Sequence, residues 1–366
     1  MIHRRCVSMI AAAVAVSWPA LAATWIVHPD GTGDFPTIRA AVEGASSGDV
    51  IELADGIFAG EGNRDVDLLG KTLVIRSASG NPSSCILDCE GQSGWPRRAF
   101  LLQSGEVPGT AVEGLTIRNG RAWHTGFAIQ GGAILAMSGA HLRIERCVFE
   151  NNEALDFDWG AYGGAVHAAL SDVEVIDCVF SGNRADTGGA LSGWFSIIRG
   201  CTFVDNAAIE SDGAVRVLSS ALIENCTFVR NTAPWGGVVH MMAGAELTLR
   251  HTILAFNQCE GAISGTDRGT AQLSCCDLYG NEGGDWIGAI ADQLGVSGNL
   301  NADPRFCAPA ADDFGLADDS PCSPGQNPEC GLIGAWPVAC AGVPARAVRW
   351  GFLKSLYRER AESEAR

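Results

Sequence analysis

The feature that most constrains this chain is a repeat of about 24 residues that runs through its middle. Each repeat has two markers, a pair of residues that is usually Gly-Gly and, further on, the pattern Cys-x-Phe-x-x-Asn. The first residue of the pair stands at Gly131, Gly163, Gly188, Asp212, Gly236 and Glu260, in steps of 32, 25, 24, 24 and 24. The asparagines stand at Asn152, Asn183, Asn206, Asn231, Asn257 and Asn281. A fixed period of this length predicts a solenoid.

The spacing inside one repeat predicts short strands rather than helices. Apolar residues alternate over a few positions and the alternation then slips by one, which leaves no room for a helix of ordinary length. The slip falls at Glu145-Arg146, Ile176-Asp177, Arg199-Gly200 and Glu224-Asn225. Asp, Gly and Asn enter the left-handed backbone region at low cost, so we expect a corner at the second residue of each pair. Each unit then holds three strands and three turns.

Stacked coils about 4.8 Å apart place identical residues above one another. We therefore expect vertical columns inside the solenoid, formed by Cys147, Cys178, Cys201, Cys226 and Cys276, by Phe149, Phe180, Phe203 and Phe228, and by the asparagines. These columns are predicted to be structural, because a coil that is not stacked cannot bury its inward face. Burial contributes roughly 1.5–3 kcal/mol for each large apolar side chain before entropy is counted.

The pairing of GGA[ILV] with FxxN over residues 66–306 resembles the repeats of polymorphic outer membrane proteins and, more broadly, right-handed parallel β-helix proteins of the pectate-lyase-like superfamily. Residues 30–58 are similar to the entry segment of pectin methylesterases. The resemblance implies an all-β fold, a single-stranded right-handed parallel β-helix with a short N-terminal capping helix and a disulfide-rich C-terminal tail. One face of that helix is predicted to carry Ile38, Ala41, Val42 and Ala45, which would cover the apolar end of the coil.

The chain divides into five predicted segments. They are a signal peptide (1–23), an N-terminal cap (24–65), the coils (66–306), a Cys-rich closing segment (307–340) and a basic amphipathic tail (341–366). The first has a basic start, an apolar stretch and small residues before a cleavage point near Ala22-Ala23. No later stretch is long and apolar enough to span a bilayer. We expect secretion to the periplasm, the cell surface or the medium, and a monomer.

Thirteen cysteines remain beyond the signal peptide, of which five belong to the interior column. Side chains one coil apart are poorly oriented for bridging. The other eight are Cys85, Cys89, Cys259, Cys275, Cys307, Cys322, Cys330 and Cys340. We expect them to form four disulfides in an oxidising compartment, one of them between Cys307 and Cys340. Zinc is the competing interpretation, but the sequence has no Cys-x-x-Cys pair.

The formal charge of −17 argues against nucleic acid or an anionic membrane as partner, since phosphate binding needs a basic face. This negative charge is compatible with bound calcium, and no other cofactor is expected.

If the apolar residue after Gly-Gly-Ala points inward, the next residue points outward. Those outward residues are Leu135, His167, Ser192, Arg216, His240 and Ser264. We expect them to form a shallow exposed floor, and in the superfamily such a face often lines a saccharide cleft. A solvated polar stripe is the alternative.

Two insertions, at 121–130 and 153–162, enter this face from the same turn. Insertions gathered on one side of a solenoid often mark its binding surface. The predicted substrate-binding residues are Trp123, His124, Trp159, Tyr162, Ser192 and Trp235, because exposed aromatic rings offer flat platforms for sugars. Alternatively, Trp123 and Trp159 pack the loops onto the coil.

The candidate catalytic residues are Asp156, Asp158, His167, Asp186, Asp212, Arg216 and His240. Paired carboxylates could bind calcium or transfer protons, and a glycosidase needs two of them about 5–10 Å apart. A lyase needs a base. Arg216 would need a lowered pKa for that role, whereas His167 and His240 titrate nearer neutrality.

The sequence lacks the Asp-Phe-Ile-Phe-Gly element of the methylesterases, the Gly-His-Gly of the polygalacturonases and the Asp-His and Arg-x-Pro-x-x-Arg elements of the common pectate lyases. We therefore expect a secreted protein that binds an extracellular polysaccharide or other surface glycan, with cleavage by a lyase or glycoside hydrolase reaction left open. The alternative is a non-enzymatic surface or adhesin-like protein of the polymorphic outer membrane protein type.

Overall fold

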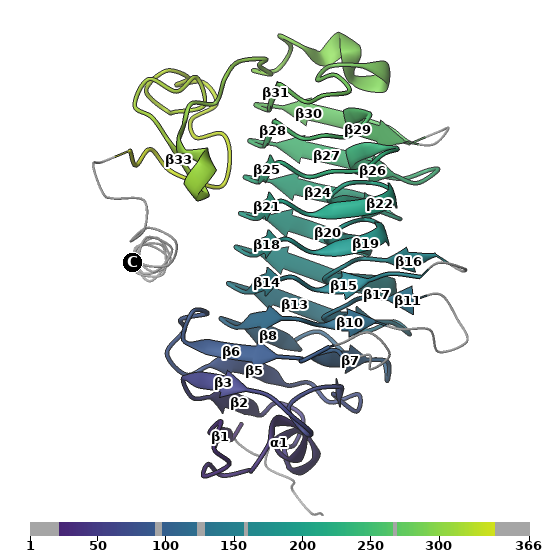
Figure 1. The fold of residues 1–366 in the computed structure, drawn as a ribbon, viewed down its shortest axis with the longest axis vertical. Helices are drawn as coiled ribbons and strands as arrows, with labels where there is room; N and C mark the ends of the chain where they lie inside the picture. Colours follow the sequence, from purple (N-terminus) through teal and green to yellow (C-terminus); the bar gives the residue numbers. More distant parts are fainter. Residues whose placement is uncertain (1–21, 92–96, 123–128, 157–159, 266–268, 341–366) are drawn as a thin grey trace, which may run out of the picture.

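The structure is a computed structural model that describes residues 22–91, 97–122, 129–156, 160–265 and 269–340. Parallel strands wind into coils that stack along the long axis of the molecule (Figure 1), which confirms the predicted all-β solenoid. The helices are α1 (Ile38–Gly44) and two short 3-10 turns, η1 (Gly288–Gln293) and η2 (Pro309–Ala311). No helix in these ranges is long and apolar enough to cross a membrane.

Three parallel sheets form the sides of the coil. The first sheet contains β1 (Thr24–Val27), β2 (Val50–Leu53), β4 (Val66–Asp67), β5 (Val74–Ser77), β7 (Phe100–Leu102), β8 (Ala111–Glu113), β12 (Ile134–Ala136), β13 (His141–Glu145), β17 (Val166–Ile176), β20 (Leu191–Arg199), β23 (Val215–Val217), β24 (Ala221–Glu224), β26 (Gly237–Met241), β27 (Glu246–Arg250), β29 (Gly261–Gly265) and β30 (Thr270–Ser274). The second sheet contains β3 (Gly56–Phe58), β6 (Cys85–Asp88), β9 (Thr116–Arg118), β14 (Val148–Glu150), β18 (Val179–Ser181), β21 (Thr202–Val204), β25 (Thr227–Val229), β28 (Ile253–Ala255) and β31 (Asp277–Tyr279). The third sheet contains β10 (Arg121–Ala122), β11 (Ile129–Gln130), β15 (Glu153–Ala154), β16 (Ala161–Tyr162), β19 (Arg184–Thr187) and β22 (Ala207–Ser211). The closing segment adds an antiparallel pair, β32 (Phe306–Ala308) and β33 (Asp313–Leu316).

The phenylalanines of the second sheet form the predicted interior column. Phe149, Phe180, Phe203 and Phe228 pair in register from coil to coil and are fully buried. Their rings stack with centroids 4.9, 4.9 and 4.5 Å apart and planes within 4° of parallel. The column thus fills the interior between coils with repeated ring contacts.

The asparagines form a hydrogen-bonded ladder at one turn. Asn206 is representative: its Oδ1 accepts from both the backbone N–H and the Nδ2 of Asn183, at 3.1 and 2.9 Å. Its own Nδ2 donates to the carbonyl of Phe180 and to Oδ1 of Asn231, both at 3.0 Å. Each side chain therefore satisfies buried backbone groups of its own and neighbouring coils, as predicted.

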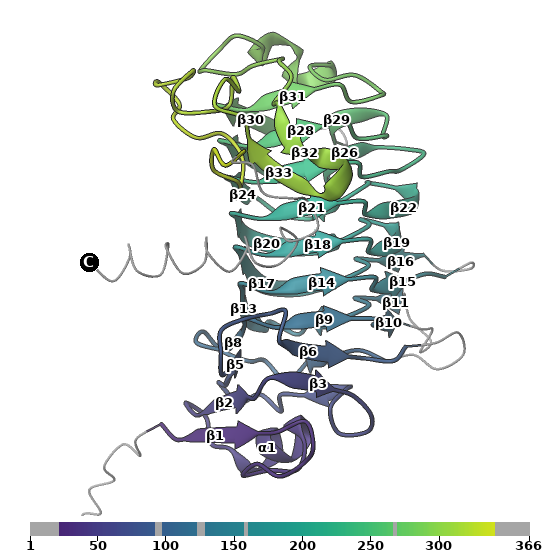
Figure 2. The ribbon, with the colours of Figure 1, turned by 60° about the vertical axis from the view of Figure 1, so that its left-hand side comes forward.

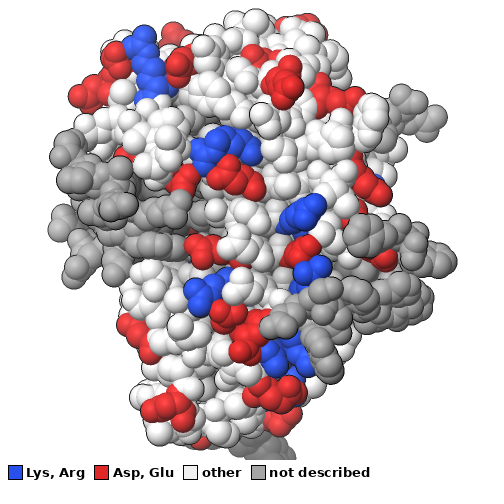
Figure 3. All heavy atoms as spheres, in the orientation of Figure 1, with Lys and Arg blue, Asp and Glu red and all other residues white. Residues whose placement is uncertain are grey.

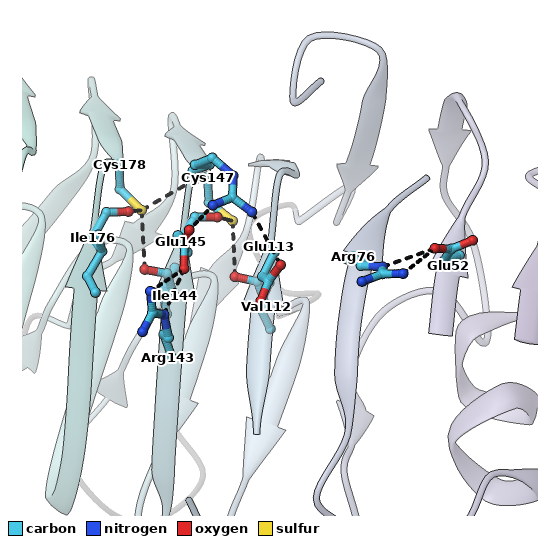
Figure 4. A network of polar contacts seen from close by, with 11 residues as sticks. Glu52, Arg76, Val112, Glu113, Arg143, Ile144, Glu145, Cys147, Ile176 and Cys178 are labelled. Carbon is cyan, nitrogen blue, oxygen red and sulfur yellow. Dashed lines mark hydrogen bonds and ion pairs between the residues drawn. The ribbon is translucent and has the colours of Figure 1, made fainter. Parts of the chain in front are cut away.

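The interior cysteines are free thiols that bond to the backbone (Figure 4). Cys178 Sγ contacts the carbonyls of Ile144 and Ile176 at 3.6 and 3.1 Å, and it accepts from the N–H of Cys147 at 3.4 Å. Burial raises the pKa of the Cys147 and Cys178 thiols well above the usual value. These thiols are therefore protonated, and their role is structural, as expected.

The predicted corners adopt left-handed backbone conformations. Arg146, Asp177, Gly200 and Asn225 have φ values of 51°, 51°, 65° and 51°. Each corner turns the chain from the first sheet into the second, so the slip in apolar alternation marks a change of sheet.

The N-terminal end of the coil is covered by α1, whose residues Ile38, Ala41 and Val42 are fully buried. The predicted capping helix is therefore present. Lys71 Nζ donates to three carbonyls at the C-terminal end of this helix, at 2.7–2.9 Å. Parallel pairing already begins within 24–65, where β1 pairs with β2.

The closing segment folds back over the outer face of the second sheet (Figure 2). Trp336 Nε1 donates to Thr202 Oγ1 at 2.7 Å, and Phe314 packs with Val204 and Val229. Arg230 bonds to Asp312 on the same segment at 2.6 Å. These contacts attach the segment to coils that lie far from it in the sequence.

Two of the four expected disulfides form, Cys275–Cys330 and Cys307–Cys340. The pairing of Cys307 with Cys340 is confirmed. The expectation of four was wrong, because Cys85, Cys89, Cys259 and Cys322 are buried free thiols. Cys322 Sγ instead lies 3.2 Å from Asp277 Oδ2, and the other three occupy interior positions.

The ladder gives a test of the packing. Asn206→Ala leaves the buried Asn183 N–H without its acceptor and removes the bonds of the Asn206 amide to the Phe180 carbonyl and to Asn231 Oδ1, so we expect at least about 2 kcal/mol of destabilisation. Guanidinium unfolding would measure the loss. Asn301→Ala, at an exposed asparagine, should change stability by less than about 0.5 kcal/mol. Equal effects of the two substitutions would show that the ladder does not stabilise the stack.

Candidate functional site

Two in-register rows of side chains meet at the edge where the third sheet passes into the first. The strand row lies on the first sheet and consists of Leu135, His167, Ser192, Arg216, His240 and Ser264. The corner row consists of Gln130, Tyr162, Thr187, Ser211 and Trp235, in the same register from coil to coil. The predicted column of outward residues is thus a continuous row.

Tyr162 of the corner row reaches across to the strand row. Its ring centroid is 5.9 Å from that of His167, and the guanidinium of Arg216, two coils further on, lies 5.3 Å from the ring centroid. Ser192, which stands between His167 and Arg216, is small enough to leave this space. The two rows therefore contact one another through Tyr162, and we call the surface that they form together the cleft.

The side chains of the strand row are more buried than those of the shallow exposed floor that the sequence predicted. His167 is 4% exposed and Ser192 is fully buried, whereas Arg216 and His240 keep 18% and 15% of their side chains exposed. The sequence did not predict that the corner row covers the strand row, because the alternation of residues along one strand does not show which residues of another sheet pack against it. Solvent therefore reaches the cleft mainly at Arg216 and His240.

Asp212 occupies a repeat position that is glycine in four coils and Glu260 in the last one. Gly131, Gly163, Gly188 and Gly236 have φ values of 60°, 67°, 67° and 74°, and Asp212 has 68°. A residue with a Cβ costs roughly 1 kcal/mol more than glycine in this region. Strain of this kind clusters at functional sites. Here the chain departs from its own repeat to place a carboxylate in the cleft.

The Asp212 carboxylate contacts two members of the strand row. Its Oδ2 lies 3.6 Å from Arg216 Nε, and its Oδ1 lies 3.3 Å from His240 Nδ1. Burial raises the pKa of Asp212 to about 6 even though Arg216 lowers it. Gly236 makes room for the carboxylate, because a Cβ there would lie 2.5 Å from Asp212 Oδ1.

His240 is oriented from one side only. Its Nδ1 lies 2.8 Å from Ser264 Oγ, which in turn accepts from the backbone N–H of Gly237 at 2.6 Å. Burial and Arg216 lower the pKa of His240 to about 4, so the imidazole is neutral at neutral pH. Both contacts involve Nδ1, so neither of them occupies Nε2.

The buried half of the cleft contains polar atoms without hydrogen-bond partners. Among the described residues they include His167 Nδ1, Ser192 Oγ, Asp212 Oδ1 and Arg216 Nε. Burial, with Arg216 and Arg98 nearby, lowers the pKa of His167 to about 3. Buried polar atoms normally find partners, so this concentration in one place points to a site completed by solvent or a ligand.

The predicted carboxylate candidates are not all brought together. Asp156 donates its backbone N–H to Asp186 Oδ2 at 3.1 Å, and burial raises the pKa of Asp186 to about 6. The nearby carboxylates that contribute to this shift are Glu210 and Asp156, and Asp212 is not among them. Asp186 and Asp212 therefore titrate in separate environments. Asp158, Trp123, His124 and Trp159 lie outside the described residues.

Trp235 stands at the open side of the cleft with 65% of its surface exposed. It precedes Gly236 and its carbonyl accepts from the N–H of Asp212 at 3.1 Å. In the ranges that the structure describes, no group of three or more His, Cys, Asp or Glu side chains is arranged to hold a metal ion. Calcium binding stays a prediction.

A hollow of about 690 Å³ lies elsewhere, on the outer face of the first sheet, lined by charged residues that include Glu113, His141, Arg143 and Asp172. Several of these form ion pairs, such as Arg143 with Glu145 at 2.6 Å and His141 with Asp172 at 3.5 Å. On the face drawn in Figure 3, acidic and basic side chains are interspersed. The cleft is the stronger candidate, because several of its buried polar atoms have no hydrogen-bond partner among the described residues.

A family model described as the right-handed beta helix region matches residues 109–300, more than half of the chain. The chain belongs to the right-handed β-helix family. This confirms the predicted fold class and handedness, while the narrower resemblance to polymorphic outer membrane proteins stays a prediction. A search of curated proteins finds no match.

Solved structures similar to this β-helix protein include a pectin methylesterase from carrot, at 13% identity and a TM-score of 0.36, covering 76% of this chain and 88% of that one. Pectate lyase Pel9A matches at 10% identity and a TM-score of 0.31, covering 87% of this chain and 97% of that one. The alginate lyase AlyGC matches at 12% identity and a TM-score of 0.25, covering 87% and 59%.

Asp212→Gly tests whether the aspartate at this glycine position lowers the stability of the protein. We expect this variant to be more stable than the wild type, since it relieves strain and removes a buried carboxylate. A carboxyl whose pKa is raised in the folded state stabilises it below the unfolded pKa, and this stability is lost as pH rises from about 4 to about 6. The gain from Asp212→Gly should therefore be larger at pH 8 than at pH 4, by roughly 2–3 kcal/mol.

The matched control is Asn225→Gly, at a left-handed corner with φ 51° on the partly exposed surface, where the side chain does not titrate. It should give only the strain relief of about 1 kcal/mol, with the same value at both pH values. Chemical unfolding at pH 4 and pH 8 measures both variants. A destabilised Asp212→Gly would contradict the argument that the carboxylate is costly to hold.

Proposed function

We propose that this protein binds a uronate-containing polysaccharide across the cleft and cleaves it by β-elimination. The observation that carries the proposal is the buried Asp212, placed at a glycine position and in contact with both Arg216 and His240. A stack built only for structure has no use for this arrangement. The fold of the family permits many functions, so the proposal rests on the side chains of the cleft.

Binding is assigned to Arg216 and Trp235. The guanidinium of Arg216 is partly exposed, and arginine suits the planar, two-oxygen geometry of a sugar carboxylate. Trp235 offers a flat exposed ring beside it for the apolar face of a neighbouring sugar. The pair favours an acidic saccharide over a neutral one. An overall charge of −17 opposes such a ligand at long range, so recognition depends on this local cation.

The chemistry is assigned to the dyad of Asp212 and His240. In the reaction the ionised Asp212, whose Oδ1 lies 3.3 Å from Nδ1, accepts a hydrogen bond from the Nδ1–H of the neutral imidazole, which keeps Nε2 as the basic nitrogen. Nε2 takes the proton from C5 of the uronate while Arg216 neutralises the adjacent carboxylate. The C4–O bond then breaks, a C4=C5 double bond forms, and the departing oxygen takes a proton from water. The rate should rise with pH through about 6, where Asp212 ionises.

The two disulfides support an oxidising compartment and hence the proposed secretion. The other proposed interpretation, a non-enzymatic surface protein, would use the same coils as a scaffold and would leave the cleft without a chemical role.

The test is product analysis with polygalacturonate, alginate and hyaluronate. Elimination creates an unsaturated sugar that absorbs in the ultraviolet. We expect His240→Gln to lower kcat/KM by at least about 100-fold, as for loss of a general base. Arg216→Lys should mainly raise KM, because a lysine keeps the charge but loses the two-pronged hydrogen bonding.

His28→Gln, at an exposed histidine far from the cleft in sequence, is the control and should leave activity unchanged. New reducing ends without ultraviolet absorbance would overturn elimination in favour of hydrolysis. Absence of turnover on all three polymers, together with absence of binding, would favour the surface protein.

A further inference from the structure

A second exposed tryptophan lies on the same face as the strand row. Trp194 is in β20, where Leu191, Gly193 and Phe195 are buried and Trp194 is 37% exposed. From Gly193 to Ser196 the residues alternate between buried and exposed, so Trp194 points outward, two residues and about 7 Å beyond Ser192 along the strand. Gly193 allows β20 to lie close to β17, because a Cβ there would lie 2.1 Å from the carbonyl oxygen of Ala168.

Trp194 and Trp235 stand on opposite sides of Arg216 and His240. Trp235 is linked through Ser211 to Thr187, so it lies two coils above the coil that carries Trp194. The offset along the axis is about 10 Å. A line from one indole to the other therefore crosses the strand row obliquely. Among the described tryptophans, these two are the exposed ones.

We propose that Trp194 is a second sugar-binding platform, and that the polysaccharide crosses the cleft obliquely between Trp194 and Trp235 with the reacting uronate at Arg216 and His240. This inference rests on the proposed function and extends it from one subsite to several. The chemistry that Trp194 selects is the apolar face of a pyranose ring, which needs one flat aromatic surface rather than a broad apolar patch. The exposed neighbour Ser196 provides a polar group suited to sugar hydroxyls.

The arrangement predicts a dependence on chain length. A disaccharide reaches only one indole, whereas a longer oligomer contacts both. Trp194→Ala and Trp235→Ala should each weaken binding of long oligogalacturonates roughly five- to tenfold. Short oligomers should be sensitive to at most one of the two substitutions. Trp194→Phe keeps a flat ring and should retain most of the affinity.

The experiment is calorimetric titration of the full chain with oligogalacturonates of two to eight units, and with alginate and hyaluronate oligomers in parallel. Phe256→Ala is the control, since Phe256 is a 36% exposed aromatic residue packed on Tyr279 at another turn. It should bind like the wild type. Circular dichroism and unfolding midpoints confirm that each variant is folded.

The outcomes separate the two proposals. If the wild type binds none of the three oligomer series, the proposed function fails and this inference fails with it. If the wild type binds long oligomers and Trp194→Ala binds them equally well, only this inference is overturned. A fall in the solution mass of Trp194→Ala relative to the wild type, with unchanged binding, would assign Trp194 to contact between copies of the chain and would also overturn it.

Discussion

The vertical register of identical inward side chains is the constraint on which the rest of this structure depends. Phe149, Phe180 and Phe203 can stack as parallel rings only if the strands that carry them follow the same backbone path in successive coils, even though the coils differ in length. The ladder of asparagines imposes the same condition at the turn, because each amide bonds to the coil on either side. The cross-section of the coil is therefore fixed, and variation is confined to outward residues and to insertions at the corners.

This uniformity makes departures from the repeat informative. A left-handed corner accepts glycine at the lowest cost, and the chain uses glycine there in four coils. Asp212 is held in the same conformation although a glycine would relieve strain, and its carboxylate is buried although burial raises its pKa. Two separate costs at one residue, next to a neutral imidazole and a guanidinium, set this corner apart from the structural ones.

The sequence predicted the elements that repeat. It did not predict the features that depend on packing between side chains of different sheets. The columns, the corners and the helix over Ile38–Gly44 follow from local patterns that recur or that have a clear apolar face. The depth of the cleft did not follow, because it depends on Tyr162 reaching His167 and Arg216 from another sheet. Trp194 was not predicted as a binding residue because it lies outside the repeated markers. Its position next to the apolar Phe195 is the signal that could have indicated an outward side chain.

The cysteines show the same limit. Cys85, Cys89 and Cys259 look like bridge partners by count, but each occupies the buried interior of the stack. The two bonds that form involve the closing segment, which lies outside the coil. Counting thiols therefore overestimates disulfides when a solenoid uses cysteine as a small apolar filler.

The contacts of the closing segment have a consequence for the order of assembly. Trp336 reaches Thr202 across 134 positions of the chain, and Ala335 reaches Thr227 across 108. Neighbouring coils are close in sequence and so can join one at a time as the polypeptide emerges, but these late partners require closure of a very long loop. The outer face of β21 and β25 thus stays uncovered until residues 335 and 336 have been synthesised, so the closing segment docks only after the coils beneath it have formed.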